Sequence, residues 1–236
     1  MRTKLRGILL LEGLIALSLP LAASAETFAI IGTGEVGSAL GQQFATLGHE
    51  IIYGSRSPDR DDVQALVAAT GEGASAATPY EAAQTADVVV LGLPDDVAED
   101  VVIGLGDLSG KIIIDPINPR TVDDDGWFDY PTHTSIAERI QILQPGARVV
   151  KAFNTFGADT MSDPDMFDHT VTVPLAGNDA EAKAFVAGLC EALGFDWIDF
   201  GPVRYSHIIE GLFLLRVNAR RSGRNFEWSF PGGPED

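Results

Sequence analysis

The sequence predicts an α/β fold, a doubly wound and mostly parallel β-sheet with extra C-terminal strands and a closing helix. Short apolar runs such as "TFAII" (27–31), "DVVVLG" (87–92) and "KIII" (111–114) lack the polar alternation of a strand that faces water. Helical segments separate these runs, and the combination is typical of a parallel sheet covered on both faces. The 236 residues, 45% of them hydrophobic, suffice for one large domain with a buried core.

The first half of the chain alternates strands and helices. Residues 38–48 carry apolar side chains at helical spacing, and Pro79 suits the first turn of a helix. The acidic pair Asp95 and Asp96 favours a helix start, because carboxylates there interact with the helix dipole. The expected strands are 27–31, 49–53, 74–78 (a weak signal), 87–92 and 111–114, and the expected helices are 38–48, 61–69, 79–84 and 95–105.

The second half continues the alternation after a long connection, residues 115–133, and such loops are usually functional. The terminal helix is apolar over a wide arc, so we expect it either to be buried against the sheet or to pair with a second copy in a homodimer. The expected strands are 148–153, 170–176 and 196–200, the expected helices are 134–143, 180–193 and 204–220, and residues 154–169 are expected to form a loop.

Three aromatic residues, Trp127, Phe128 and Tyr130, occur in the long loop. Exposed aromatic rings beside a cleft can stack on a flat ligand, and they can equally attach the loop to the domain or form a dimer contact. His133 ends the same loop and is the one histidine that we place near a ligand. All three interpretations of the aromatic residues stay open at this stage.

Composition excludes several classes of function. With 34 acidic and 16 basic residues the formal net charge is −18, so a general nucleic-acid-binding or anionic-membrane surface is not expected. Cys190 is the one cysteine, which rules out an internal disulfide and a multi-thiolate zinc site. The four histidines are scattered without metal-ligand spacing, so no metal site is predicted.

The N-terminus differs from the rest of the chain. Residues 1–25 combine a basic start, an apolar stretch and an "ASA" cleavage signal, which predicts a secretory signal peptide and export to a periplasmic or extracellular compartment. Glu12 interrupts the apolar stretch, and if the signal does not function the protein stays cytoplasmic. Residues 26–221 are then the oxidoreductase domain derived below, and residues 222–236 form a polar, loosely held tail.

The motif "GTGEVG" follows the first strand and opens the first helix, which is the context of a Rossmann-type dinucleotide-binding turn. Gly32 permits the tight turn, Gly34 lets the backbone approach a pyrophosphate, and Gly37 lets the helix pack against the strand. The pyrophosphate is expected at the helix N-terminus, so the cofactor-binding residues are Gly32, Thr33, Gly34, Glu35, Val36 and Gly37.

The second strand ends without the carboxylate that binds the ribose of NAD, because "YGSR" places Gly54 there. Nothing then repels a 2′-phosphate, and Arg56 can pair with it while Ser55 and the backbone donate hydrogen bonds. Thr33 offers a further hydroxyl. The sequence therefore predicts a preference for NADP(H), and the alternative is that Arg56 is an ordinary solvated loop charge.

Nearly all of the chain after the signal segment resembles the NADPH-dependent F420 reductase family, the F420H2:NADP oxidoreductases, to which the reductase domain of membrane ferric reductases is related. The matching segments run in order through residues 28–215, and "VVKAFNT" is the most specific of them; they are "FAIIGTGEVGSALGQQFATLGHEIIYGSRSP", "DVVVLGLP", "IIIDPINP", "ARVVKAFNTFGADTM", "PLAGNDAEAKAFVAGLCEALGFDWIDFGP" and "IIEGLFLL".

The resemblance implies hydride transfer between the nicotinamide of NADP(H) and the ring of a deazaflavin, with stacked rings and no obligatory proton-transfer residue. It implies that Thr33, Ser55 and Arg56 hold the 2′-phosphate. Turns at Leu93-Pro94 and Asn118-Pro119 then line the nicotinamide side, and Asn154, Thr155 and Phe156 shape the acceptor cleft. The turns follow the carboxyl ends of predicted strands, where such sheets bind ligands.

Two details stay open. Asn118 and Asn154 each have the alternative of simply capping a turn. Lys151, within the strand 148–153, is expected either to reach a phosphate or to protect the edge of the sheet.

The sequence as a whole predicts an oxidoreductase that passes a hydride between NADP(H) and a small, flat acceptor, either coenzyme F420 or a flavin such as FMN or FAD. One alternative is a non-catalytic NADPH-binding module, or a subunit that feeds electrons to a membrane ferric reductase partner. A less favoured alternative is an imine or hydroxyacid reductase, because such enzymes need a large helical second domain that the residues after Phe153 do not provide.

Overall fold

The computed structural model describes residues 25–129 and 133–231. The predicted signal peptide lies outside this part of the chain except for Ala25, so export remains a prediction. Tyr130 and the last five residues also lie outside it. Within the described part, no helix is both long enough and apolar enough to span a membrane.

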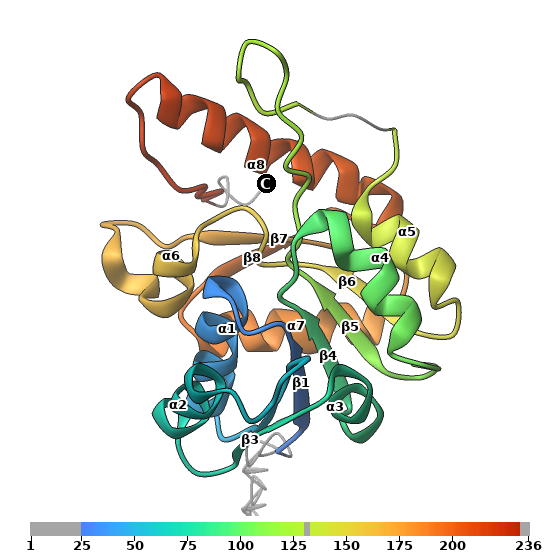
Figure 1. Ribbon diagram of the computed structural model, residues 1–236. Coiled ribbons are helices and arrows are strands. Elements are labelled where there is room, and N and C mark those ends of the chain that lie inside the picture. Colours follow the sequence, from blue (N-terminus) through green and yellow to red (C-terminus); the bar gives the residue numbers. More distant parts are fainter. Residues whose placement is uncertain (1–24, 130–132, 232–236) are drawn as a thin grey trace, which may run out of the picture.

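One eight-stranded sheet forms the centre of the molecule (Figure 1). Its order is β3-β2-β1-β4-β5-β6-β7-β8; the first six strands are parallel, β7 is antiparallel to β6, and β8 is parallel to β7. The strands are β1 (Thr27–Ile31), β2 (Glu50–Gly54), β3 (Ala74–Ala77), β4 (Val88–Leu91), β5 (Ile112–Asp115), β6 (Arg148–Lys151), β7 (Thr172–Gly177) and β8 (Asp196–Asp199). The doubly wound fold class is confirmed, and its strand order reverses between β1 and β4.

Eight helices are described, together with 3-10 turns at Pro164–Met166 and Val203–Tyr205. They are α1 (Glu35–Thr46), α2 (Asp61–Thr70), α3 (Pro79–Thr85), α4 (Asp95–Gly104), α5 (Ile136–Leu143), α6 (Ala158–Ser162), α7 (Ala180–Ala192) and α8 (Ser206–Arg221). Reciprocal capping boxes start α3 and α5, at Thr78 with Glu81 and at Ser135 with Glu138. The prediction of a plain loop over 154–169 was wrong, since α6 forms there and packs on α1.

The alternation of side chains along each strand divides the core between the two faces of the sheet. Phe28 and Ile30 of β1 pack in the cluster under α1, α2, α6 and α7. Ala29 and Ile31 of the same strand pack in the cluster under α3, α4 and α5. Both faces are therefore covered, which explains why the inner strands carry no polar alternation.

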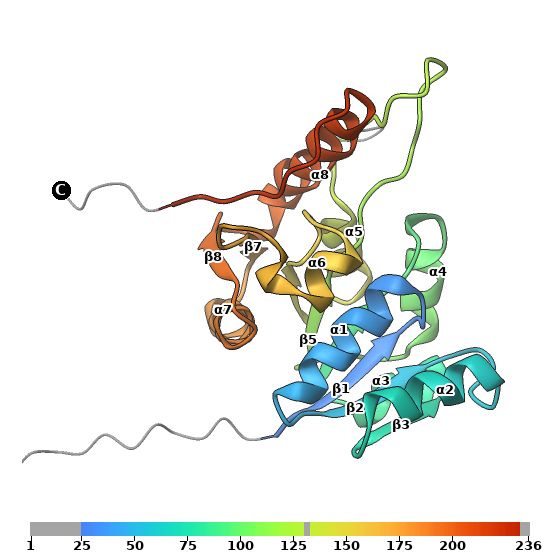
Figure 2. The same cartoon turned by 90° about the vertical axis from the view of Figure 1, so that its left-hand side faces the viewer.

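Helix α8 and the segment after it lie beyond the end of the sheet at which β1 and β4 terminate (Figures 1 and 2). The expectation that the tail is loosely held was wrong for its described part. The tail is hydrogen-bonded to Thr172 at the start of β7. The Thr172 amide donates to the Trp228 carbonyl at 2.9 Å, and the Phe230 amide donates to the Thr172 hydroxyl at 2.9 Å. β6 pairs with β7 only at Ala176 and Gly177, so the start of β7 has unpaired backbone groups on that side. The backbone of the tail can form hydrogen bonds with them.

The apolar arc of α8 is only partly explained by burial against the domain. Ile209 and Leu214 are buried, whereas Ile208 and Leu215 are 50% and 61% exposed. A homodimer through α8 stays a prediction.

Candidate active site

A cavity of about 620 Å³ opens where the strand order reverses, at the carboxyl ends of β1, β2 and β4. It brings together three groups of residues that the sequence predicts to bind the cofactor. They are the glycine turn (Gly32, Thr33 and Gly34), the end of β2 (Ser55 and Arg56) and the turn after β4 (Leu93 and Pro94).

The three glycines of the turn have the roles that their spacing predicts. Gly32 has a φ of 103°, and a Cβ there would lie 2.3 Å from the Gly92 carbonyl oxygen. A Cβ on Gly37 would lie 2.1 Å from the Gly32 carbonyl oxygen, so helix and turn pack too closely for a side chain. A Cβ on Gly34 meets nothing within 4 Å, which leaves open space above the first turn of α1. Gly34 is also the N-cap of α1 without a side-chain cap, so amide groups of that turn remain available for an anion.

The end of β2 explains why no carboxylate follows the strand. A Cβ on Gly54 would lie 2.8 Å from the Ile31 Cδ1 atom and 3.2 Å from the Pro79 Cα atom. Ser55 is 7% exposed and its hydroxyl accepts a hydrogen bond from the Ser57 amide, which leaves the hydroxyl proton to donate. The Ser55 amide donates to the Ala77 carbonyl at 2.9 Å, so a backbone donor to a phosphate, which the sequence also predicts, has to come from another residue of this turn.

Two guanidinium groups lie at this end of the first cavity. Arg56 is exposed and lines the cavity, as predicted. Arg60, the N-cap of α2, lines it as well, although the sequence alone indicates only a solvated helix start. Arg60 also forms an exposed ion pair with Asp62, and the hydrogen bond that its guanidinium donates to this carboxylate raises the pKa of Arg60.

A second cavity, of about 400 Å³, continues from the first past Gly34, Gly92, Leu93 and Pro94, which line both. Asn118 after β5 and Phe156 before α6 line it, in agreement with the predicted acceptor cleft. The two cavities therefore form one groove along the switch point of the sheet.

Asn154 and Thr155 lie behind this groove and do not line it. The Asn154 amide donates to the Asn118 side-chain oxygen at 2.8 Å, and the Asn118 amide donates to the Asn154 carbonyl at 2.7 Å. Asn154 therefore orients Asn118, which faces the cavity. Thr155 is fully buried. The sequence predicts that Asn154 and Thr155 shape the acceptor cleft, and in the structure they lie behind its wall and do not line it.

Lys151 neither reaches a phosphate nor protects the sheet edge, which corrects both interpretations of it. β6 is an inner strand, and the Lys151 ammonium contacts Asp115 at 3.1 Å, Glu210 at 2.7 Å and the Ile117 carbonyl, with all three charged side chains buried. Burial alone would lower the pKa of Lys151, but the two carboxylates outweigh it and raise that pKa. Burial raises the pKa of Asp115, and Lys151 opposes the rise.

Sequence reasoning missed one wall of the second cavity. Helix α8 supplies Phe213, Arg216, Val217 and Arg220, and these positions follow the i, i+3, i+4, i+7 spacing of one helix face. That spacing was available as a signal, but it mixes apolar and charged residues and so did not stand out. Arg120 and Gly92 were also missed.

Comparison with known proteins agrees with this geometry. Residues 27–119 match the family model described as "NADP oxidoreductase coenzyme F420-dependent". The F420-dependent NADP reductase of Methanothermobacter thermautotrophicus is 30% identical over 212 residues, which cover 82% of this chain and 89% of that protein. The chain belongs to the F420-dependent NADP reductase family.

A crystal structure from Arthrobacter sp. FB24, described as an F420-dependent NADP-reductase, superposes on the chain with a TM-score of 0.78 and 29% identity. The alignment covers 87% of this chain and all of that one. The metalloreductase STEAP3 of Rattus norvegicus is 26% identical over 187 residues, and the chain spans only 36% of its length. The family and these relatives identify the chain as an NADP-dependent oxidoreductase.

In this family member, the long loop 115–133 is attached to helix α8. Phe128 packs against Phe213 of α8 with ring centroids 6.3 Å apart, and its amide and carbonyl both bond to the Asn218 side chain at 2.9 Å. The Arg221 guanidinium lies 4.8 Å from the ring centre of Trp127. The two described aromatic residues thus attach the loop to α8, and neither lines the acceptor cavity. His133 is exposed.

Two other chemistries find no support in the described residues. They contain no group of three or more His, Cys, Asp or Glu side chains arranged to hold a metal ion. After β6 the described chain forms two strands and three helices, and the strands extend the sheet. The helical second domain that an imine or hydroxyacid reductase requires is thus not found in the described part.

Proposed function

We propose that the chain moves a hydride between NADP(H), bound in the first cavity, and a flat flavin-like or deazaflavin acceptor in the second. The observation that carries this proposal is that both cavities share Gly34, Gly92, Leu93 and Pro94. A ring bound in each cavity would meet the other at this shared wall. When bound, NADPH supplies the hydride from C4 of its nicotinamide.

The residues present fit NADP(H). The open space above Gly34 admits the pyrophosphate, and the first turn of α1 faces it. Ser55, Arg56 and Arg60 hold the 2′-phosphate at the other end of the same cavity. Glu35 and Val36 form that first turn, and Leu93, Pro94 and Asn118 lie on the nicotinamide side.

Catalysis would come from positioning. The described lining of the acceptor cavity contains no histidine, cysteine or lysine, and its one carboxylate is Glu35. Holding two rings in a near-attack arrangement provides a large part of the rate in such a site, since it removes the entropy of bringing them together. Any proton that the acceptor takes up together with the hydride then comes from water at the mouth of the cavity.

The test of cofactor preference is a titration of the purified chain with NADPH and with NADH. In Arg56→Ala the Kd for NADPH should rise about 10- to 100-fold, because a charge-assisted hydrogen bond to phosphate is lost, while the Kd for NADH stays the same. Arg148→Ala is the matched control, since it removes the same charge at the opposite, amino-terminal end of β6. Equal affinity for both nucleotides in the wild type would contradict the proposal.

A screen of F420, FMN and ferric chelates in the presence of NADPH then identifies the acceptor. The similarity to a metalloreductase favours a second candidate, an NADPH-binding subunit that feeds electrons to a separate membrane reductase. Turnover with free flavin or F420 supports the enzyme, whereas tight NADPH binding without turnover of any soluble acceptor supports the subunit.

A further inference from the structure

The Lys151 cluster, made of Lys151, Asp115 and Glu210, lies directly behind the wall of the second cavity. Ile117 belongs to that wall. The Ile117 amide donates to the Asp115 carboxylate at 2.9 Å, and the Ile117 carbonyl accepts a hydrogen bond from the Lys151 ammonium. The cluster therefore contacts the backbone segment whose next residue, Asn118, faces the cavity on the proposed nicotinamide side.

The cluster contains more negative than positive groups. The Lys151 ammonium contacts Asp115 at 3.1 Å and Glu210 at 2.7 Å, and all three side chains are at most 1% exposed. Each carboxylate also accepts a backbone amide, from Ile117 or from Ile136, and such hydrogen bonds favour the ionised form. One ammonium and two ionised carboxylates leave a net charge of −1 in the interior of the protein.

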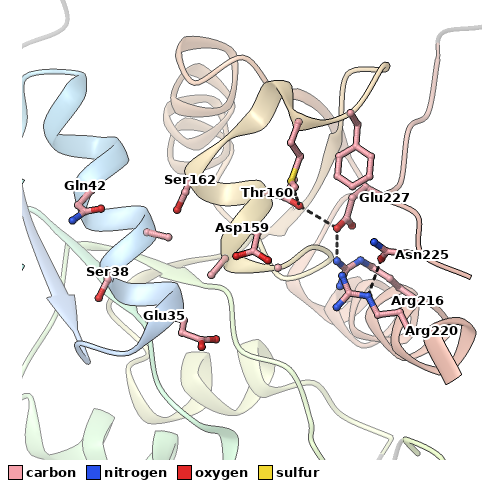
Figure 3. A pocket seen from close by; sticks show the side chains of 15 residues that line it. Glu35, Ser38, Gln42, Asp159, Thr160, Ser162, Arg216, Arg220, Asn225 and Glu227 are labelled. Atoms are coloured by element: carbon pink, nitrogen blue, oxygen red, sulfur yellow. Dashed lines mark hydrogen bonds and ion pairs between the residues drawn. The ribbon is translucent and has the colours of Figure 1, made fainter. Parts of the chain in front are cut away.

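The charges that line the second cavity do not offset this excess. Arg216 is buried, but it is paired with the buried carboxylate of Glu227, and Figure 3 shows the two side chains meeting. The remaining charged residues among the described lining are exposed, so water and salt screen them; they are Glu35, Arg120 and Arg220. The unscreened charge next to a ring bound here is therefore that of the Lys151 cluster.

Hydride transfer changes the charge of the nicotinamide. When NADPH gives up a hydride from C4, two electrons leave with it, the neutral ring becomes the cation of NADP⁺, and the acceptor takes up the hydride. A net negative charge in a low-dielectric interior stabilises that cation and has little effect on the neutral ring.

We propose that the Lys151 cluster raises the affinity of the site for NADP⁺ relative to NADPH, and that it thereby favours NADPH as the hydride donor. This inference rests on the proposed function and adds a direction to it. None of the three residues touches a ligand, and they act through their charge. Lys151 belongs to the device, because without its cation the two buried carboxylates would take up protons and lose their charge.

The test is the ratio of two dissociation constants, the Kd for NADP⁺ divided by the Kd for NADPH, measured at about pH 8. Asp115→Asn removes one negative charge and keeps an oxygen for the Ile117 amide. Lys151 and Glu210 then remain as a neutral pair. The ratio should rise about three- to tenfold, because NADP⁺ binds more weakly while NADPH binds as before. Glu210→Gln removes the other carboxylate and should raise the ratio as well.

Asp199→Asn is the matched control. Asp199 is the last residue of β8, as Asp115 is of β5, and it also pairs with a lysine, Lys183, at 2.7 Å. It is exposed, and it lies three strands away at the opposite end of the sheet, because β8 runs antiparallel to β5. The ratio in this variant should stay within about twofold of the wild type.

An unchanged ratio in both Asp115→Asn and Glu210→Gln overturns the inference, because a merely structural role would weaken the binding of both nucleotides equally. A lower ratio overturns it too. Circular dichroism and the melting temperature of each variant establish that it folds. Wild-type protein that binds neither nucleotide would refute the proposed function and this inference with it, whereas tight binding with an unchanged ratio refutes only the role of the cluster.

Discussion

Replacing Lys151 with methionine tests whether the buried charge cluster stabilises the domain. Lys151 is fully buried and is bonded to Asp115, Glu210 and the Ile117 carbonyl, which come from β5, α8 and the loop after β5. Methionine fills a similar volume but leaves two buried carboxylates without their cation. Breaking a buried ion pair from one side costs about 3–5 kcal/mol, which is a large part of the 5–15 kcal/mol that stabilises a typical protein.

The assay is thermal unfolding of wild type and Lys151→Met. For a chain of this length, 3–5 kcal/mol corresponds to a melting temperature lower by about 6–20 °C. The loss should also depend on pH. Burial raises the pKa of Asp115 above that of the unfolded chain, and removing Lys151 takes away the effect that opposes this rise. The unfolded state then binds fewer protons between the two pKa values, so stability falls as pH rises through that window, and the loss is larger at about pH 8 than at about pH 5.

Two further variants make this prediction specific. In Lys151→Met with Asp115→Asn the extra pH dependence should become smaller, because one of the two buried carboxylates is gone, while an oxygen remains to accept a hydrogen bond from the Ile117 amide, now 2.9 Å long. Lys183→Met breaks a partly exposed pair with Asp199, 2.7 Å long, and should cost less than about 1 kcal/mol. A Lys151→Met protein within about 1 kcal/mol of the wild type would refute the reasoning.

Three more predictions test the cofactor turn and the core. Gly34→Ala should leave the melting temperature within about 2 °C, because its Cβ meets nothing within 4 Å, yet raise the Kd for NADPH at least about tenfold, because the methyl group occupies the approach of the pyrophosphate. Gly37→Ala, whose Cβ would lie 2.1 Å from the Gly32 oxygen, should instead lower stability by about 1–3 kcal/mol; unchanged stability would show that helix and turn can separate. Burial raises the pKa of the Cys190 thiol, so a thiol reagent at about pH 8 should label it only after unfolding in guanidinium chloride, and rapid labelling of the folded chain would contradict its burial.

The parts of the fold that depend on local signals were predictable. Apolar runs, the glycine turn and the first-turn acids each specify one element through its own residues, and the alternation of strands with helices indicates a mostly parallel sheet. The cofactor residues were predictable for the same reason. The glycine turn and the end of β2 each combine a turn conformation with a chemical group, as at Gly32 and Arg56.

The residues that were misjudged depend on partners far away in the sequence. Lys151 is 36 residues from Asp115 and 59 from Glu210, so its strand position alone gave no sign of the ion pairs. The sequence indicated Arg60 only as a helix start. Its position in the first cavity was missed, because that position depends on how α2 packs on the rest of the domain. The tail was predicted to be polar and loosely held, because its sequence does not show that Glu227 is buried with Arg216 and Thr160 as its partners.

Helix α8 links these observations, because it forms one wall of the second cavity. A ligand beyond the carboxyl ends of the strands needs an opposing wall that excludes water. One part of α8 fixes the helix to the core through Glu210, and the next turns present Phe213, Arg216, Val217 and Arg220 to the second cavity. The stability of the Lys151 cluster and the shape of the acceptor cavity are therefore coupled. A variant that weakens the cluster should loosen acceptor binding before it affects NADPH, whose cavity contains no α8 residue.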